Sequence, residues 1–139
     1  MSIGIILNAG KNHIRDTLLK AKTQQNLFLG LMAETTLPGA GSDLGLGITE
    51  ITGTGYARIE IVNNTDWTLN GDGVVDMSTK QFVVGAGGWN GVGGYFIASA
   101  LTGGVALYSD IFPVADQGTQ TEDTKINVNI KHSIKDVND

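Results

Sequence analysis

The sequence predicts a mainly β fold, a β-sandwich of about eight short strands with one short N-terminal α-helix. Glycine accounts for 20 of the 139 residues and proline for only 2, and glycine supplies the positive φ angles that tight turns need. Short β-branched runs separated by Gly, Thr, Asn and Asp recur along the chain, as in sandwiches and barrels. Only one segment has the period of an amphipathic helix. We therefore expect strands and hairpins to dominate.

The helix is expected within residues 8–23. Asn8 is a suitable N-cap residue, and Ile14, Leu18 and Ala21 follow at spacings that place them on one helical face. The prediction is one short helix with a single apolar stripe.

Most of the remaining chain is predicted to form strands. The run at residues 26–33 is almost wholly apolar, which is typical of a strand buried on both faces. In residues 56–62, Ala57, Ile59 and Ile61 share one face and polar side chains share the other. The Asn-Gly-Asp-Gly sequence that follows residue 69 is a strong hairpin-turn signal. Further strands are predicted at residues 48–51, 67–69, 74–77, 80–84, 95–101, 105–112 and from residue 125 onward.

The last strand has the clearest alternation. Its core-facing residues are predicted to be Ile126, Val128 and Ile130, and its outward-facing residues Asn127, Asn129 and Lys131. The glycine-rich stretch at residues 85–94 is predicted to be a wide turn or bulge with close backbone packing. Residues 34–47 are predicted to be an exposed loop, and a loop of this length is often a contact element.

The whole chain, residues 1–139, is predicted to be a single domain, because no composition break or repeat divides it. A chain of this length folds without a metal or a disulfide, and it has no cysteine. The apolar segment at residues 1–7 is either an N-terminal arm that docks on a neighbour or the first internal strand. If it is an arm, its deletion should leave the melting temperature nearly unchanged.

No motif supports a catalytic, cofactor-binding or metal-binding role, so the chain is not expected to be an enzyme. The Gly-Lys pair at residues 10–11 lacks the other residues of a phosphate-binding loop. No register of the dinucleotide-binding glycine pattern completes within residues 85–94. Residues 66–77 lack the final glutamate of a calcium loop. His13 and His132 stand at no metal-ligand spacing.

Charge and hydropathy limit the classes of partner that we expect this chain to bind. The formal net charge of −5 and the lack of a strong basic patch argue against direct nucleic-acid binding. No run approaches the ~20 apolar residues that span a bilayer, and no secretory signal is recognisable. We therefore expect no membrane partner and synthesis in a cytoplasm.

The candidate assembly contacts are apolar or aromatic. The N-terminal segment contributes Ile3, Ile5, Ile6 and Leu7, which are available for docking if the segment is an arm. Trp67 and Trp89 lie in or beside turn-rich polar stretches. Each of them is either an exposed interface residue or a cap on the core.

Four segments together resemble a known group of proteins. They are Leu-Asn-Ala-Gly-Lys-Asn from residue 7, Leu-Phe-Leu-Gly-Leu from residue 27, Gly-Tyr-Ala-Arg from residue 55, and the strand, Gly-Gly turn, strand unit at residues 94–108. In this order they are similar to small bacteriophage virion proteins described as decoration-like or tail-fibre-like. The resemblance covers about residues 7–130. It implies a β-sandwich that coats or connects parts of a virion, without catalytic residues.

The leading hypothesis is a capsid cement or decoration protein. Such a protein binds the outer surface of the major capsid protein shell, associates with itself as a homo-oligomer and stabilises the assembled particle. We expect it on the capsid surface of the virion, after synthesis in the host cytoplasm. The first alternative is a tail, neck or receptor-binding component. The second is a carbohydrate-binding sandwich module that uses Trp67 or Trp89 as a stacking platform.

Overall fold

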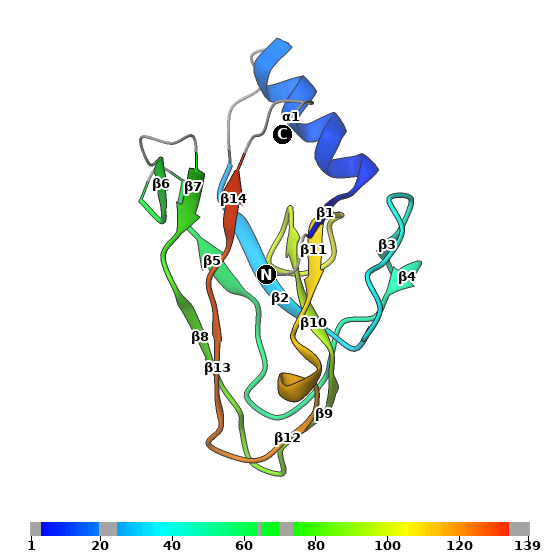
Figure 1. Ribbon diagram of the computed structural model, residues 1–139, viewed down its shortest axis with the longest axis vertical. Helices are drawn as coiled ribbons and strands as arrows, with labels where there is room; N and C mark the ends of the chain where they lie inside the picture. The colour runs from blue at the N-terminus through cyan, green and yellow to red at the C-terminus, as the bar shows by residue number, and fades with distance from the viewer. Residues whose placement is uncertain (1–3, 20–24, 64, 70–73, 134–139) are drawn as a thin grey trace.

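The computed structural model describes residues 4–19, 25–63, 65–69 and 74–133. In this part of the chain the fold is mainly β, with strands β1 to β14, the α-helix α1 (Asn8–Leu19) and the 3₁₀-helix η1 (Val114–Asp116) (Figure 1). The strands are short, from two residues to six. The predicted fold class is therefore confirmed, and the helix falls within the predicted range.

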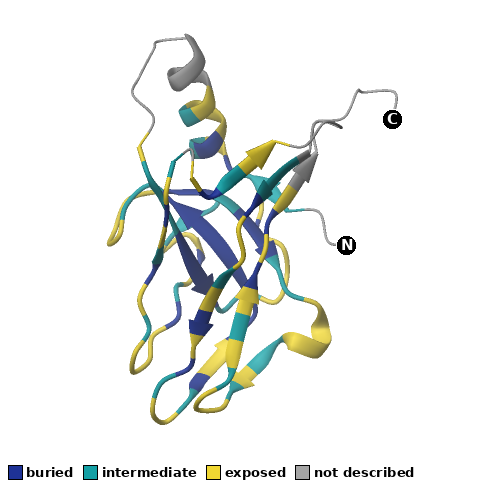
Figure 2. Ribbon diagram, turned by 90° about the vertical axis from the view of Figure 1, so that its left-hand side faces the viewer, coloured by how far each residue is buried: buried dark blue, intermediate teal, exposed yellow. Residues whose placement is uncertain are grey.

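A five-stranded sheet forms the centre of the molecule. Its middle strand β10 and the neighbouring strand β2 are largely buried, which explains why their sequences are nearly continuous apolar runs. Figure 2 shows buried residues concentrated in the central strands, whereas the turns are mostly exposed. Each strand is antiparallel to its neighbours, in the spatial order β1 (Ile5–Ile6), β11 (Ala106–Ile111), β10 (Gly94–Ala98), β2 (Leu27–Met32) and β5 (Ile59–Ile61).

Smaller sheets pack against one face of this central sheet. Residues from β7, β8, β9 and β13 share a core cluster with Leu29 and Leu31 of β2 and with Tyr95 and Ile97 of β10. The smaller sheets are β8 (Lys80–Val83) with β13 (Lys125–Val128), β9 (Trp89–Val92) with β12 (Gly118–Gln120), and β6 (Trp67–Leu69) with β7 (Val74–Met77) and β14 (Lys131–Ser133). This layer completes the sandwich.

The alternation predicted for the last strand is confirmed. Val128 and Ile130 are buried and Ile126 packs against the same cluster. The residues between and after them, Asn127, Asn129 and Lys131, are exposed. The register with β8 places Val128 opposite Lys80. The alternation of apolar and polar residues along the chain was therefore enough to predict which side chains of this strand face the core.

A second core cluster lies on the other face of the central sheet. It contains Phe96 of β10, Met32 of β2 and Ile48, with Leu44 packed against it. The last two residues belong to β3 (Asp43–Leu44) and β4 (Gly47–Ile48), which pair with each other. Pro38, in the same segment, is also buried. The prediction of an exposed loop at residues 34–47 is therefore wrong in part, because this segment covers apolar side chains of the sheet.

Several predicted elements differ in extent from the observed ones. The strand expected at residues 56–62 is reduced to β5, and the Tyr56 and Arg58 side chains before it hydrogen-bond to Glu50 instead. The glycine-rich stretch contains β9 as well as turns. Its predicted close backbone packing is present, because a Cβ on Gly93 would lie 2.0 Å from the carbonyl oxygen of Glu34.

Candidate functional site

The N-terminal segment belongs to the fold from residue 5 onward. Ile5 and Ile6 form β1, the edge strand that pairs with β11. Leu7 is fully buried, and its amide donates to the carbonyl of Leu107 at 2.9 Å. The arm interpretation is therefore wrong for these three residues, because strand pairing and burial hold them within their own domain. Ile3 lies outside the described residues, and its role stays a prediction.

Trp89 lies in the core. Its side chain is 1% exposed, and its ring meets that of Tyr56 edge-on with centroids 5.5 Å apart. The indole Nε1 donates to the carbonyl of Thr54 at 2.9 Å, which satisfies the polar group that a buried tryptophan carries. A Cβ on Gly53 would lie 2.3 Å from the indole Cδ1, so glycine lets the backbone cover the ring. The interface and stacking interpretations of Trp89 are therefore wrong.

Trp67 keeps part of its surface. It lies opposite Met77 across the β6–β7 pair and packs against the main core cluster while remaining half-buried. Leu69 on the same strand is exposed. Trp67 therefore remains a candidate contact.

Arg58 makes a buried ion pair that the alternation of its strand does not predict. Its side chain is 4% exposed, and it binds the carboxylate of Glu50 through two bonds, Nε to Oε2 at 2.8 Å and Nη2 to Oε1 at 3.0 Å. The third nitrogen, Nη1, donates to the carbonyls of Ala100 at 2.7 Å and Gly103 at 2.8 Å. The guanidinium carbon lies 5.2 Å from the ring centroid of Phe96. Arg58 thus fixes the turn between β10 and β11.

Tyr56 extends this network toward β2. Its hydroxyl donates to Oε2 of Glu50 at 2.8 Å and accepts the amide of Leu31 at 2.9 Å. Burial raises the pKa of Tyr56 far above its ordinary value, so the hydroxyl stays protonated and remains a donor. The carboxylate of Glu50 is therefore committed to structural bonds.

Asp66 is a second structural carboxylate. It accepts bonds from the Ser78 hydroxyl at 2.7 Å and the Val62 amide at 2.6 Å, and its Oδ2 lies 2.9 Å from Nζ of Lys80. The bonds from Ser78 and Lys80 lower the pKa of Asp66 to about 2. This carboxylate ties β6 to the start of β8. Within the described ranges, no group of His, Asp and Glu side chains is arranged to hold a metal ion.

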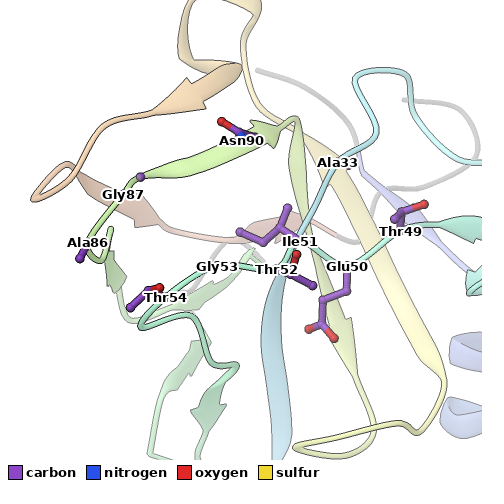
Figure 3. Close-up of a pocket in the computed structure, with 11 residues that line it drawn as sticks. Ala33, Thr49, Glu50, Ile51, Thr52, Gly53, Thr54, Ala86, Gly87 and Asn90 are labelled. Carbon is purple, nitrogen blue, oxygen red and sulfur yellow. The ribbon is translucent and has the colours of Figure 1, made fainter.

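An open groove of about 460 Å³ lies between residues 49–54 and the turn from β8 to β9 (Figure 3). We call it the threonine groove, because Thr49, Thr52 and Thr54 line it together with Asn90. Glu50 also lines it, but Arg58 and Tyr56 hold its carboxylate. The groove therefore offers neutral hydroxyl and amide groups, without a pair of groups suited to acid–base chemistry.

A second groove of about 460 Å³ lies between η1 and β13. Its apolar lining includes Phe112 and Ile126, and its charged lining consists of Asp116 and Lys125. Among the described residues around either groove there is no histidine.

Two neighbouring turns carry large exposed apolar side chains. Leu46, in the turn from β3 to β4, is 67% exposed, while Leu101 and Val105, in the turn from β10 to β11, are 53% and 39% exposed. Oδ1 of Asp43 accepts the amide of Ala106 at 2.8 Å and so ties the two turns together. We call Leu46, Leu101 and Val105 the apolar turn cluster. Large exposed apolar side chains on two linked turns are candidate protein contacts.

Comparisons with known proteins do not assign the chain. No protein-family model matches it, and no curated protein matches it significantly. In the part of the chain that the structure describes, no helix is both long and apolar enough to cross a membrane.

Proposed function

We propose that this chain is a non-enzymatic structural protein of a bacteriophage particle, a capsid cement or decoration protein. In this role it binds the outer surface of the major capsid protein shell, and it also contacts further copies of itself. Binding to the assembled shell, and not to free subunits, stabilises the shell by mass action. This role requires a rigid domain whose surface is complementary to that of the shell.

One observation carries the proposal: the segments that resemble phage virion proteins come together in a single structural unit. Residues 7–12 join β1 to α1, residues 27–31 lie in β2, and residues 55–58 lead into β5. Residues 94–108 supply β10 and the first part of β11. Segments far apart in sequence thus build the central sheet and the start of the helix beside it (Figure 1). This convergence is expected if the resemblance reflects a shared fold.

The use of charged residues supports a structural role. Arg58, Glu50 and Asp66 are engaged in bonds that hold turns and strand ends. Asp43 accepts two backbone amides, those of Leu44 and Ala106, both at 2.8 Å. Each of these carboxylates, and the guanidinium, is thus engaged in hydrogen bonds within the fold.

The apolar turn cluster is the face that we expect to meet the shell. Complete burial of a fully exposed leucine or valine side chain contributes ~1.5–3 kcal/mol, and each of these partly exposed side chains would contribute a part of that value on docking. Arg58 fixes the turn that carries Leu101 and Val105 before binding. A turn that is already ordered loses little conformational entropy when it docks.

The test is the copy number in purified virions of the phage that encodes the chain, with particle stability measured in parallel. A cement protein should be present in hundreds of copies, and particles that lack it should release DNA at a lower temperature. A dozen copies or fewer would indicate a tail or neck component. Absence from the virion would refute the proposal.

A matched pair of variants tests the contact face. Val105→Ser should reduce incorporation into particles, whereas Val114→Ser on η1 should not. Val114 is the more exposed of the two, at 85%, so loss of general surface hydrophobicity predicts the opposite order. Both purified variants should be checked for unchanged melting temperature. Equal incorporation of the two variants would remove the apolar turn cluster from the proposal.

A further inference from the structure

We propose that the threonine groove binds an extended peptide segment of a partner protein, which adds as a strand along its backbone edges. This inference goes beyond the proposed function, because it names a separate site and the chemistry of its ligand. It holds or fails on the isolated chain, whatever particle the chain belongs to.

One wall of the groove is an extended segment that leaves its strand partner. Thr49 and Ile51 pair with the end of β2, through bonds from the Ala33 amide at 2.9 Å and to the Leu31 carbonyl at 3.1 Å. After Ile51 this pairing stops. Within the described residues, the amide and carbonyl of Thr52 have no backbone partner. This wall therefore presents unpaired donors and acceptors next to the groove.

The other wall is formed by β9 and the turn before it. In the described part of the chain, β9 has a strand neighbour on one side only, β12. The register between them shifts where Asn90 and Gly91 lie, and both of these residues are exposed. An edge strand with exposed backbone is a ready template for another chain. Figure 3 shows Asn90 on this wall, across the groove from residues 49–54.

Close backbone contacts hold the two walls at both ends. A Cβ on Gly93 would lie 2.7 Å from the carbonyl oxygen of Ala33, and one on Gly85 would lie 1.9 Å from that of Thr54. Backbone atoms cannot move aside as flexible side chains do, so these contacts set the width of the opening. A preformed opening lowers the entropic cost of binding. Its volume of about 460 Å³ is within the range of ligand sites, ~300–1,000 Å³.

The lining favours a peptide over a sugar or a charged ligand. Its side-chain polar groups are hydroxyls and a carboxamide, and its one carboxylate, that of Glu50, is paired with Arg58. Trp89, whose chain neighbours Gly88 and Asn90 line the groove, is buried beneath Gly53 and so offers no stacking surface. Strand addition draws its affinity from main-chain hydrogen bonds and needs no charge or aromatic platform. We therefore expect a neutral segment with small side chains at alternate positions.

The experiment uses the full chain and a displayed library of random short peptides. A peptide enriched on the chain is synthesised, and its affinity is measured by fluorescence anisotropy for two double variants. T52K/N90K places two long charged side chains in the groove, while T68K/N127K makes the same two changes at exposed positions elsewhere. We expect the groove variant to bind at least tenfold more weakly and the control variant to bind normally. Both variants should melt at the temperature of the unmodified chain.

Two further measurements define the mode of binding. A copy of the peptide with methylated backbone nitrogens should lose binding, because it can no longer donate main-chain hydrogen bonds. A glycan array is probed in parallel with the same variants. The inference is overturned if no peptide is enriched, if the groove variant or the methylated peptide binds as well as the original, or if glycans bind in a manner that only T52K/N90K abolishes.

Discussion

Replacing Arg58 with methionine tests whether the buried ion pair holds the domain together. Methionine keeps much of the length of the arginine stem but removes the guanidinium, so the Glu50 carboxylate loses its charge partner and two carbonyls lose their donor. Removal of one partner from a buried ion pair costs ~3–5 kcal/mol. The Glu50 side chain is 29% exposed, so water can reach it after the change. We therefore expect the free energy of unfolding to fall by about 3 kcal/mol, near the lower end of this range.

The assay is urea unfolding, followed through circular dichroism and through tryptophan fluorescence, to which Trp67 and the buried Trp89 both contribute. Lys125→Met is the matched control, because it removes a positive charge from an exposed site and should change stability by less than ~0.5 kcal/mol. For a domain of this size, the Arg58→Met change should also lower the melting temperature by about 10 °C.

A double variant separates the ion pair from simple loss of packing. Glu50→Leu combined with Arg58→Met should destabilise the chain by less than the sum of the two single changes, with a difference of about 1–3 kcal/mol. An additive result would mean that the two side chains act independently. If Arg58→Met proves as mild as Lys125→Met, the reasoning about this network is refuted.

The fold leads to four further predictions. Val128→Asp should unfold the domain, because it buries an unpaired charge. Asn127→Asp should shift stability by less than ~0.5 kcal/mol in the same urea assay. Comparable losses from the two substitutions would contradict the strand assignment. The pKa of Asp66 is lowered to about 2, so its ionised carboxylate should add ~1–2 kcal/mol to the stability of the domain. This contribution should be complete above about pH 4 and should be lost as the pH falls toward 2. Acid unfolding curves of Asp66→Asn should lack this component. Asp123 has a φ of 66°, so Asp123→Val should cost about 1–2 kcal/mol and Asp123→Gly should be nearly neutral in thermal melts. Leu7→Ala should cost ~2–5 kcal/mol in equilibrium unfolding, in contrast to the result that a free arm would give.

Asn129 is a poorer control than Asn127 for the Val128→Asp change. Asn129 is exposed, as its place in the alternation predicts, but its side-chain amide donates to Oδ1 of Asp76 and to the carbonyl of Met77. A carboxylate at this position would face two acceptors. Asn127 instead accepts a bond from Gln81 at 2.9 Å, and an aspartate can still accept it. Asn127 is therefore the better neutral site.

Local patterns predicted the elements whose burial depends on local geometry. The alternation that placed Val128 and Ile130 inside requires only that successive side chains point to opposite faces. The apolar run at residues 26–33 predicted a strand covered on both faces, and β2 lies within it. These elements follow from residues within one strand, so they can be read without knowledge of the partners.

The burial of Arg58 could not be predicted in this way. Its acceptors at Ala100 and Gly103 are 42 and 45 residues distant in sequence, and Glu50 is 8 residues distant, in a different predicted strand. An arginine that alternates with isoleucines is normally placed on the solvent side. Its burial depends on a hairpin turn that returns over it, and the sequence carries no local signal for that contact.

The burial of Trp89 could not be predicted from the sequence either, because it depends on neighbouring glycines. The glycines around it predict turns, and turns suggest exposure. In the structure, Gly53 lets the backbone lie against the indole, and Gly85 lets a second stretch of backbone approach Thr54. Glycine thus produces turns and close packing alike, and a single sequence does not distinguish the two. The threonine groove could not be predicted either, because its walls come from separate segments.

The two proposed contact regions meet at the same ion pair. Glu50 lines the threonine groove, and its partner Arg58 holds the turn that carries Leu101 and Val105. Arg58→Met should therefore weaken both peptide binding and incorporation into particles, under conditions where the variant is still folded. Val105→Ser should affect incorporation alone, and T52K/N90K should affect peptide binding alone. If Arg58→Met alters only one of the two activities, the ion pair does not support both surfaces, and each must then be held in place by its own local contacts.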